Sequence, residues 1–146
     1  MNAQNYTQKS LEAIQAAQKL TIANQNQQIE QIHLLTALLQ QENGLVPQLL
    51  RKMGVTLESF EAAANAELEK LPRVTGSGRE ADKYYVARAV DTALNGAEDI
   101  AKQMKDEYVS VEHLFLSLIE NADAPLKALF RRHFGLSMSI WREGNA

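Results

Sequence analysis

Three histidines are the residues of this chain best suited to acid–base or metal chemistry. His33 and His113 stand at the starts of predicted helices, and His133 stands near the end of another. One interpretation of each is a metal ligand or a general base. However, the chain has no HExxH pair, no cysteine and no Asp or Glu cluster at ligand spacing. We therefore interpret the histidines as helix-end residues that hydrogen-bond locally or carry a charge favoured by the helix dipole, and we expect no metal.

Sequence motifs for other catalytic chemistry are also missing. The chain has no GxxxxGK[ST] loop and no GxSxG turn, and its Gly-Ser-Gly at 76–78 is too short to cradle a phosphate. The carboxylates within 106–112 and the pair Arg131-Arg132 complement the dipoles of predicted helices. We therefore expect a binding domain that uses no cofactor, rather than an enzyme.

The bulk composition excludes several classes of partner. The net charge is −3 and no basic stripe is present, so we expect neither nucleic acid nor an acidic membrane surface as a partner. Residues 1–20 contain no unbroken apolar run, so they predict neither a signal peptide nor a membrane span. The absence of cysteine fits a reducing cytosol, and we expect a cytoplasmic protein. A length of 146 residues with 45% hydrophobic side chains fits one compact domain.

Apolar residues recur at helical spacing over most of the chain, which predicts an all-α fold. Capping residues and helix breakers divide this pattern into eight predicted helices. Residues 24–28 are expected to form a loop, and 72–80 a linker. The helices are expected after Thr7, from near Ile32 to Asn43-Gly44, from about Val46 to Met53, after Thr56 as far as Pro72, over 86–104, after Ser110, from Pro125 to Phe134, and over 137–141.

The two halves of the sequence match when one is shifted by 80 residues. The shift places His33-Leu34 on His113-Leu114, and four apolar helix faces coincide in the same order. One extra residue before the third helix changes the shift to 81 and places Gly54 on Gly135. Two unrelated amphipathic helices can also be aligned, but chance does not readily keep the histidines and the capping glycines in step. We therefore predict a true duplication.

The duplication predicts two four-helix units related by a pseudo-two-fold axis. The first repeat spans residues 1–71, the linker 72–80 and the second repeat 81–146, within one compact domain. The seam between two such units is a natural place for a groove. The second helix of each unit is the most uniformly apolar and should lie innermost. Six side chains of these helices are predicted to be buried at the centre: Leu35, Leu38, Leu39, Leu114, Leu118 and Ile119.

The repeated pattern resembles a known family. Residues 7–17 (TQKSLEAIQAA) and 29–35 (IEQIHLL) are similar to the first half of the N-terminal domain of Clp ATPases. Residues 108–115 (YVSVEHLF) are similar to its second half. The linker, LPRVTGSG at 71–78, is most similar to the ClpB type, which disaggregates proteins. The resemblance covers the chain to about Ser137, whereas residues 138–146 match poorly.

This resemblance implies an eight-helix double repeat that caps a hexameric AAA+ ring. In the family, the domain recruits unfolded or aggregated protein for the ring, jointly with the DnaK chaperone system. Thr7, Asp106 and Glu112 match polar positions that the family ties to substrate contact. Ile100 and Phe115 would belong to an apolar groove beside them. The sequence contains no ATPase motif, so the resemblance implies a substrate-binding domain and not the motor.

An adaptor-docking domain of the ClpA or ClpC type is the alternative. ClpC-type domains hold a Glu-His pair in both repeats, and the pair binds phosphorylated arginine. Here Glu112-His113 keeps the pair, but the first repeat has Ile32-His33. Since an isoleucine cannot bind a guanidinium group, this sequence and its linker favour the ClpB type.

Overall fold

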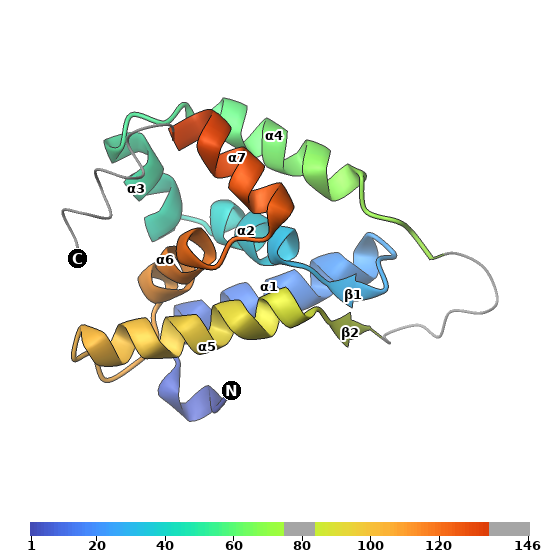
Figure 1. Ribbon diagram of the computed structural model, residues 1–146. Helices are drawn as coiled ribbons and strands as arrows, with labels where there is room; N and C mark the ends of the chain where they lie inside the picture. The colour runs from blue at the N-terminus through green and yellow to red at the C-terminus, as the bar shows by residue number, and fades with distance from the viewer. Residues whose placement is uncertain (75–83, 135–146) are drawn as a thin grey trace.

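The structure, a computed structural model, describes residues 1–74 and 84–134. These residues form seven α-helices, one 3-10 helix and two short strands (Figure 1). The all-α prediction is confirmed, while the predicted eighth helix at 137–141 lies outside the described residues. In chain order the elements are η1 (Ala3–Asn5), α1 (Gln8–Ala23), β1 (Gln28–Ile29), α2 (Gln31–Gln40), α3 (Leu45–Lys52), α4 (Leu57–Glu69), β2 (Tyr85–Val86), α5 (Arg88–Gln103), α6 (Val111–Glu120) and α7 (Ala124–Phe134).

Local sequence explains where several helices begin and end. The Thr7 hydroxyl accepts a hydrogen bond from the backbone N–H of Ser10 at 3.2 Å, which caps α1 as predicted. Gly54 follows α3 with φ of 81°, a conformation that glycine adopts without a steric penalty. Ser110 precedes α6 as its predicted N-cap. These helix ends therefore coincide with the capping residues that the sequence indicated.

The duplication read from the sequence reappears in the helices. The bounds of α1 and α5 differ by 80 residues, and so do those of α2 and α6. The turns after the first helix of each repeat also share a left-handed backbone conformation, since Gln25 and Lys105 have φ of 57° and 60°. The division at residues 71 and 81 stays a prediction, because part of the connection lies outside the described residues.

Two short parallel pairings join the repeats to each other. Gln28 and Ile29 of β1 pair with Tyr85 and Val86 of β2, and Tyr6 forms a matching bridge with Val109. Under the 80-residue shift these two pairings are equivalent. The sequence prediction was wrong here, because it placed residue 28 in a loop and residue 86 in a helix. Two-residue strands have no hydrophobic period that would identify them.

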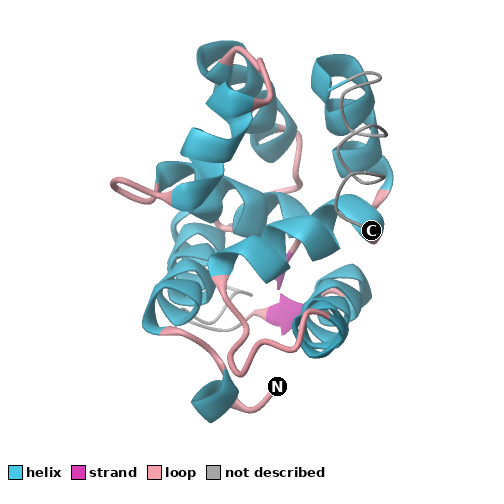
Figure 2. Ribbon diagram, turned by 90° about the vertical axis from the view of Figure 1, so that its left-hand side faces the viewer, coloured by secondary structure: helices cyan, strands magenta, loops and turns pink. Residues whose placement is uncertain are grey.

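Helices α2 and α6 lie in the middle of the molecule. Figures 1 and 2 show them between a layer of α1 and α5 and a second layer of α3, α4 and α7. The prediction that they would lie innermost is confirmed, and all six side chains named for the centre are at most 6% exposed. Two of the polar residues predicted for the site lie close to the start of α6, since Asp106 precedes this helix and Glu112 stands in its first turn.

Candidate functional site

The connection between α5 and α6 positions most of the predicted site. Helix α5 ends at Gln103, Lys105 follows in the left-handed region with φ of 60°, and the N–H of Asp106 then donates to the carbonyl of Ala101 at 2.9 Å. This turn directs the chain back toward the first repeat, where Val109 pairs with Tyr6. Asp106 is thus fixed by its backbone, while its side chain remains 47% exposed.

His113 holds Asp106 in place from the first turn of α6. Its Nδ1 accepts a hydrogen bond from the backbone N–H of Ser110 at 2.8 Å, so a neutral ring carries its proton on Nε2. Nε2 lies 2.7 Å from a carboxylate oxygen of Asp106 and donates to it. The interpretation of His113 as a locally bonded helix-start residue is confirmed. The ring therefore orients a carboxylate at the surface.

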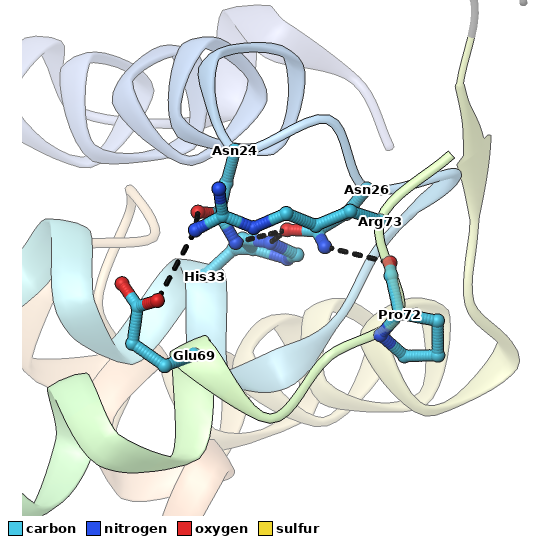
Figure 3. A network of polar contacts seen from close by, with 6 residues as sticks. All are labelled: Asn24, Asn26, His33, Glu69, Pro72 and Arg73. Atoms are coloured by element: carbon cyan, nitrogen blue, oxygen red, sulfur yellow. Dashed lines mark hydrogen bonds and ion pairs between the residues drawn. The ribbon is translucent and has the colours of Figure 1, made fainter. Parts of the chain in front are cut away.

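His33 forms the equivalent contacts in the first repeat (Figure 3). Its Nδ1 accepts from the N–H of Glu30 at 2.8 Å, and its Nε2 lies 2.8 Å from the side-chain oxygen of Asn26. Asn26 also donates to the carbonyl of Pro72 at 3.0 Å, so the linker covers this network. Burial lowers the pKa of His33 to about 4, and the ring is neutral near neutral pH.

Thr7 lies next to the start of α6 through its backbone. Its N–H donates to the carbonyl of Val109 at 2.9 Å, and the hydroxyl of Ser10 lies 2.9 Å from the same oxygen. Glu112 is half-buried in the first turn of α6. Thr7, through its backbone bond to Val109, thus lies beside the segment 106–112 that carries Asp106 and Glu112, and a common binding role for the three stays a prediction.

The two apolar residues of the predicted site are mostly covered. Ile100 is 8% exposed at the end of α5. Phe115 is 0% exposed, and its ring packs edge to face with Phe130 at a centroid distance of 6.4 Å. Neither side chain offers much surface, and that of Phe115 lies in the central core.

Two exposed apolar side chains near the site were missed by the sequence analysis. Met104 is 46% exposed and Tyr108 is 49% exposed, and both belong to the connection that carries Asp106. The sequence analysis placed Met104 in a helix over 86–104, but α5 ends at Gln103 and Met104 lies in the turn that follows, while Tyr108 was not named as a site residue. With the three polar residues they form what we call the 104–112 surface: Thr7, Met104, Asp106, Tyr108 and Glu112.

The first repeat holds a cavity of about 240 Å³ at a different place. Burial, followed by the charge of Asp123, raises the pKa of its Glu30 carboxyl above the ordinary value. None of the predicted site residues contributes to this cavity. The lining residues are Asn26, Gln27, Gln28, Glu30, Leu71, Pro72 and Val74.

The described part of the chain contains neither a candidate metal cluster nor a candidate membrane-spanning helix. Within residues 1–74 and 84–134, no three His, Asp or Glu side chains are placed to hold a metal ion. Over the same ranges, no helix has both the length and the apolar character needed to cross a bilayer.

Comparison with known proteins identifies relatives over nearly the whole chain. The Clp repeat (R) N-terminal domain matches residues 5–133. Chaperone protein ClpB of Nitratidesulfovibrio vulgaris is 39% identical over 137 residues, which are 94% of this chain and 16% of that protein. Chaperone protein ClpB of Porphyromonas gingivalis is 41% identical over 119 residues, 82% of this chain and 13% of that protein. The chain thus spans less than a fifth of the length of these relatives.

Solved structures show the same fold at lower identity. The Hsp104 N-terminal domain from Candida albicans has a TM-score of 0.77 and 24% identity, covering 88% of this chain and 81% of that one. The N-terminal domain of the ClpV1 ATPase from E. coli EAEC has a TM-score of 0.75 and 21% identity, covering 96% and 83%. The fold, the repeat and the sequence relatives agree, and the chain belongs to the family of Clp repeat N-terminal domains.

Proposed function

We propose that this chain is the substrate-binding N-terminal domain of a ClpB-type ATP-dependent chaperone. In this role it recruits unfolded or aggregated protein for a hexameric AAA+ ring, which acts jointly with a DnaK-type chaperone system. The family match and the ClpB relatives support the proposal. Because the chain spans 16% of the first of these relatives, the ring and its ATPase activity belong to the proposal as well.

The exposure of Met104 and Tyr108 is the observation that carries this proposal. An unfolded client exposes apolar segments that a folded protein hides. A receptor that selects such clients therefore needs exposed apolar side chains of its own. Met104 and Tyr108 provide them next to Asp106 and Glu112, whose carboxylates can bind main-chain amides of an extended client.

Ile100 and Phe115 have a supporting role in this proposal. Ile100 is nearly covered, and Phe115 is fully covered, so neither can provide the main contact area. Phe115 belongs to the central core, and Ile100 to the buried face of α5. The seam itself is closed at Thr7 by its bond to Val109, so the client lies along the surface rather than inside the seam.

Binding by one domain should be weak. Two half-exposed side chains give a small apolar contact, and an unfolded client loses conformational entropy when it is held. Several copies on one ring would compensate through avidity. Weak single contacts also allow the client to leave for the ring.

An amide chemical-shift titration with casein, an unfolded model client, tests the proposed surface. Shifts should cluster at Thr7, Met104, Asp106, Tyr108 and Glu112. The Tyr108→Ser variant should weaken binding roughly tenfold, the usual effect of losing a contact worth about 1–2 kcal/mol. Tyr85→Ser is the matched control, since Tyr85 is also an exposed tyrosine, at 68%, and lies on β2.

Two results would contradict the assignment. Equal losses from Tyr108→Ser and Tyr85→Ser would show that exposed aromatic side chains act without a defined site. Shifts that appear only with a folded adaptor, and not with casein, would favour the adaptor-docking function of the ClpA or ClpC type.

A further inference from the structure

The cavity of about 240 Å³ in the first repeat has one polar wall and one apolar wall. The polar wall lies within the segment 26–30, which includes β1, and it presents three side-chain amides and the carboxylate of Glu30. The apolar wall consists of Leu71, Pro72 and Val74, which follow α4. A ligand that fits both walls has an aliphatic part and a polar end.

Two hydrogen bonds hold these walls at a fixed separation. The side-chain amide of Asn26 donates to the carbonyl of Pro72 at 3.0 Å (Figure 3). The backbone N–H of Val74 donates to the carbonyl of Gln25 at 2.8 Å. Asn26 is itself held in place, because it is 2% exposed and its side-chain oxygen lies 2.8 Å from Nε2 of His33. The walls of the cavity are therefore set before a ligand binds.

Glu30 gives the cavity a negative charge. Its carboxylate accepts a hydrogen bond from the side-chain amide of Gln28, and no ion pair in the described part of the chain includes it. Burial, and after it the charge of Asp123, raises the pKa of this carboxyl. An environment that favours a bound proton on a carboxylate also favours a bound cation.

Arg73 does not supply that cation, although it follows Pro72 in the sequence. Its guanidinium donates to the side-chain oxygen of Asn24 at 2.9 Å and to the carboxylate of Glu69 at 3.1 Å (Figure 3). The Arg73 side chain does not line the cavity. The negative charge in the cavity is therefore left for a ligand.

We propose that this cavity binds one lysine side chain of an extended protein segment. The aliphatic stem lies against the apolar wall, and the ammonium group donates to the Glu30 carboxylate and to the amide oxygens of Gln27 and Gln28. Gln28 already occupies one carboxylate oxygen of Glu30. The compact ammonium of lysine therefore fits better than the flat guanidinium of arginine, which binds both oxygens of a carboxylate at once.

The binding of a lysine side chain does not depend on the function proposed above. Only the further statement that the lysine belongs to an unfolded client rests on that proposed function. The two proposals also concern separate surfaces, since no residue of the 104–112 surface lines the cavity. Failure of the lysine site would therefore leave the casein titration unaffected, and the reverse also holds.

An amide chemical-shift titration of the intact chain with Nα-acetyl-lysine amide tests the proposal. Shifts should cluster at residues 27–30 and at Leu71 and Val74, and they should saturate in the millimolar range. Nα-acetyl-norleucine amide has the aliphatic stem without the ammonium, and it should bind at least about fivefold more weakly, as should Nα-acetyl-arginine amide. Equal binding of the norleucine compound, tighter binding of the arginine compound, or no shifts at these residues would overturn the proposal.

Three variants separate the site from general electrostatic attraction. Glu30→Gln removes the charge and should raise the dissociation constant for the lysine compound roughly tenfold or more. Glu58→Gln is the matched control, because Glu58 is an exposed glutamate in the first turn of α4 and lies outside the cavity. It should change that constant by less than about twofold. Val74→Phe fills the cavity without changing any charge and should abolish binding.

Circular dichroism of each variant checks that the helices are retained. Equal losses from Glu30→Gln and Glu58→Gln would show that the lysine compound is attracted to acidic surface in general, which would overturn the proposal. Undiminished binding by a folded Val74→Phe variant would overturn it as well, because the lysine side chain would then lie elsewhere.

Discussion

Acid should destabilise this domain through His33. The ring is 0% exposed, and burial lowers its pKa from 6.5 to about 4. Protonation has a second cost, because Nδ1 must give up the hydrogen bond that it accepts from the N–H of Glu30. The unfolded chain therefore binds a proton near pH 6.5, whereas the folded chain resists it until about pH 4.

The sign and the size of the effect follow from this difference. Above pH 6.5 the ring is neutral in both states, so the full stability is present. As the pH falls from 6.5 toward 4, the unfolded state alone gains a proton, and the free energy of unfolding decreases. One pKa unit corresponds to about 1.4 kcal/mol, so the whole decrease is about 3 kcal/mol. Below about pH 4 both states are protonated and this contribution no longer changes.

Urea unfolding followed by circular dichroism at several pH values between 7 and 4 measures this decrease. His33→Gln is the reference variant, because glutamine at this helix position can still accept the N–H of Glu30 and does not titrate. The wild type should lose about 3 kcal/mol more than the variant over this range. Asn26→Asp, which copies the Asp106 of the second repeat, should reduce that loss, since a carboxylate at Nε2 favours the protonated ring. Parallel stability curves for the wild type and His33→Gln would refute the reasoning.

Three further outcomes are expected. Leu38→Ala and Leu118→Ala should each lower the free energy of unfolding by about 2–5 kcal/mol in urea denaturation, because both side chains are 0% exposed, and unchanged melting temperatures would show that the core is assigned wrongly. Gly96→Ala should lower the free energy of unfolding by about 1–3 kcal/mol in the same measurement, although alanine has the better helix propensity. The reason is that the new Cβ would lie 2.5 Å from the side chains of Ser117 and Asn121. A gain in stability would contradict this contact. Calorimetric titration with Mg-ATP should give no heat of binding, since the chain has no P-loop, and micromolar binding would contradict the non-enzyme prediction.

Helix positions were largely predictable because caps and apolar spacing are local signals. Helices begin after Thr7 and Ser110 and one ends before Gly54, as the types of these residues indicated. The two strand pairings were not predictable, because each depends on residues about 57 or 103 positions apart that touch only after the halves have packed. The sequence analysis therefore predicted the two repeats but missed the strand pairings that join them.

Some of the predicted site residues are accessible and others are buried, and the sequence alone could not separate the two groups for a similar reason. Thr7, Asp106 and Glu112 lie on or beside the segment that leads into α6, and their common role in binding stays a prediction. Phe115 was placed at the groove through the family resemblance, but packing in the structure covers it fully. Met104 and Tyr108 belong to a turn, where periodicity gives no information about exposure.

The duplication also explains why the proposed surface occurs in one repeat only. In the first repeat, the turn after α1 is covered by the linker, since Asn26 bonds to Pro72 and the N–H of Val74 donates to the carbonyl of Gln25 at 2.8 Å. A buried turn favours a neutral partner for the histidine, and Asn26 is 2% exposed. The equivalent turn of the second repeat leaves the Asp106 side chain 47% exposed, where a charge costs little. One ancestral histidine cap has therefore become a buried structural network in one repeat and a charged surface in the other.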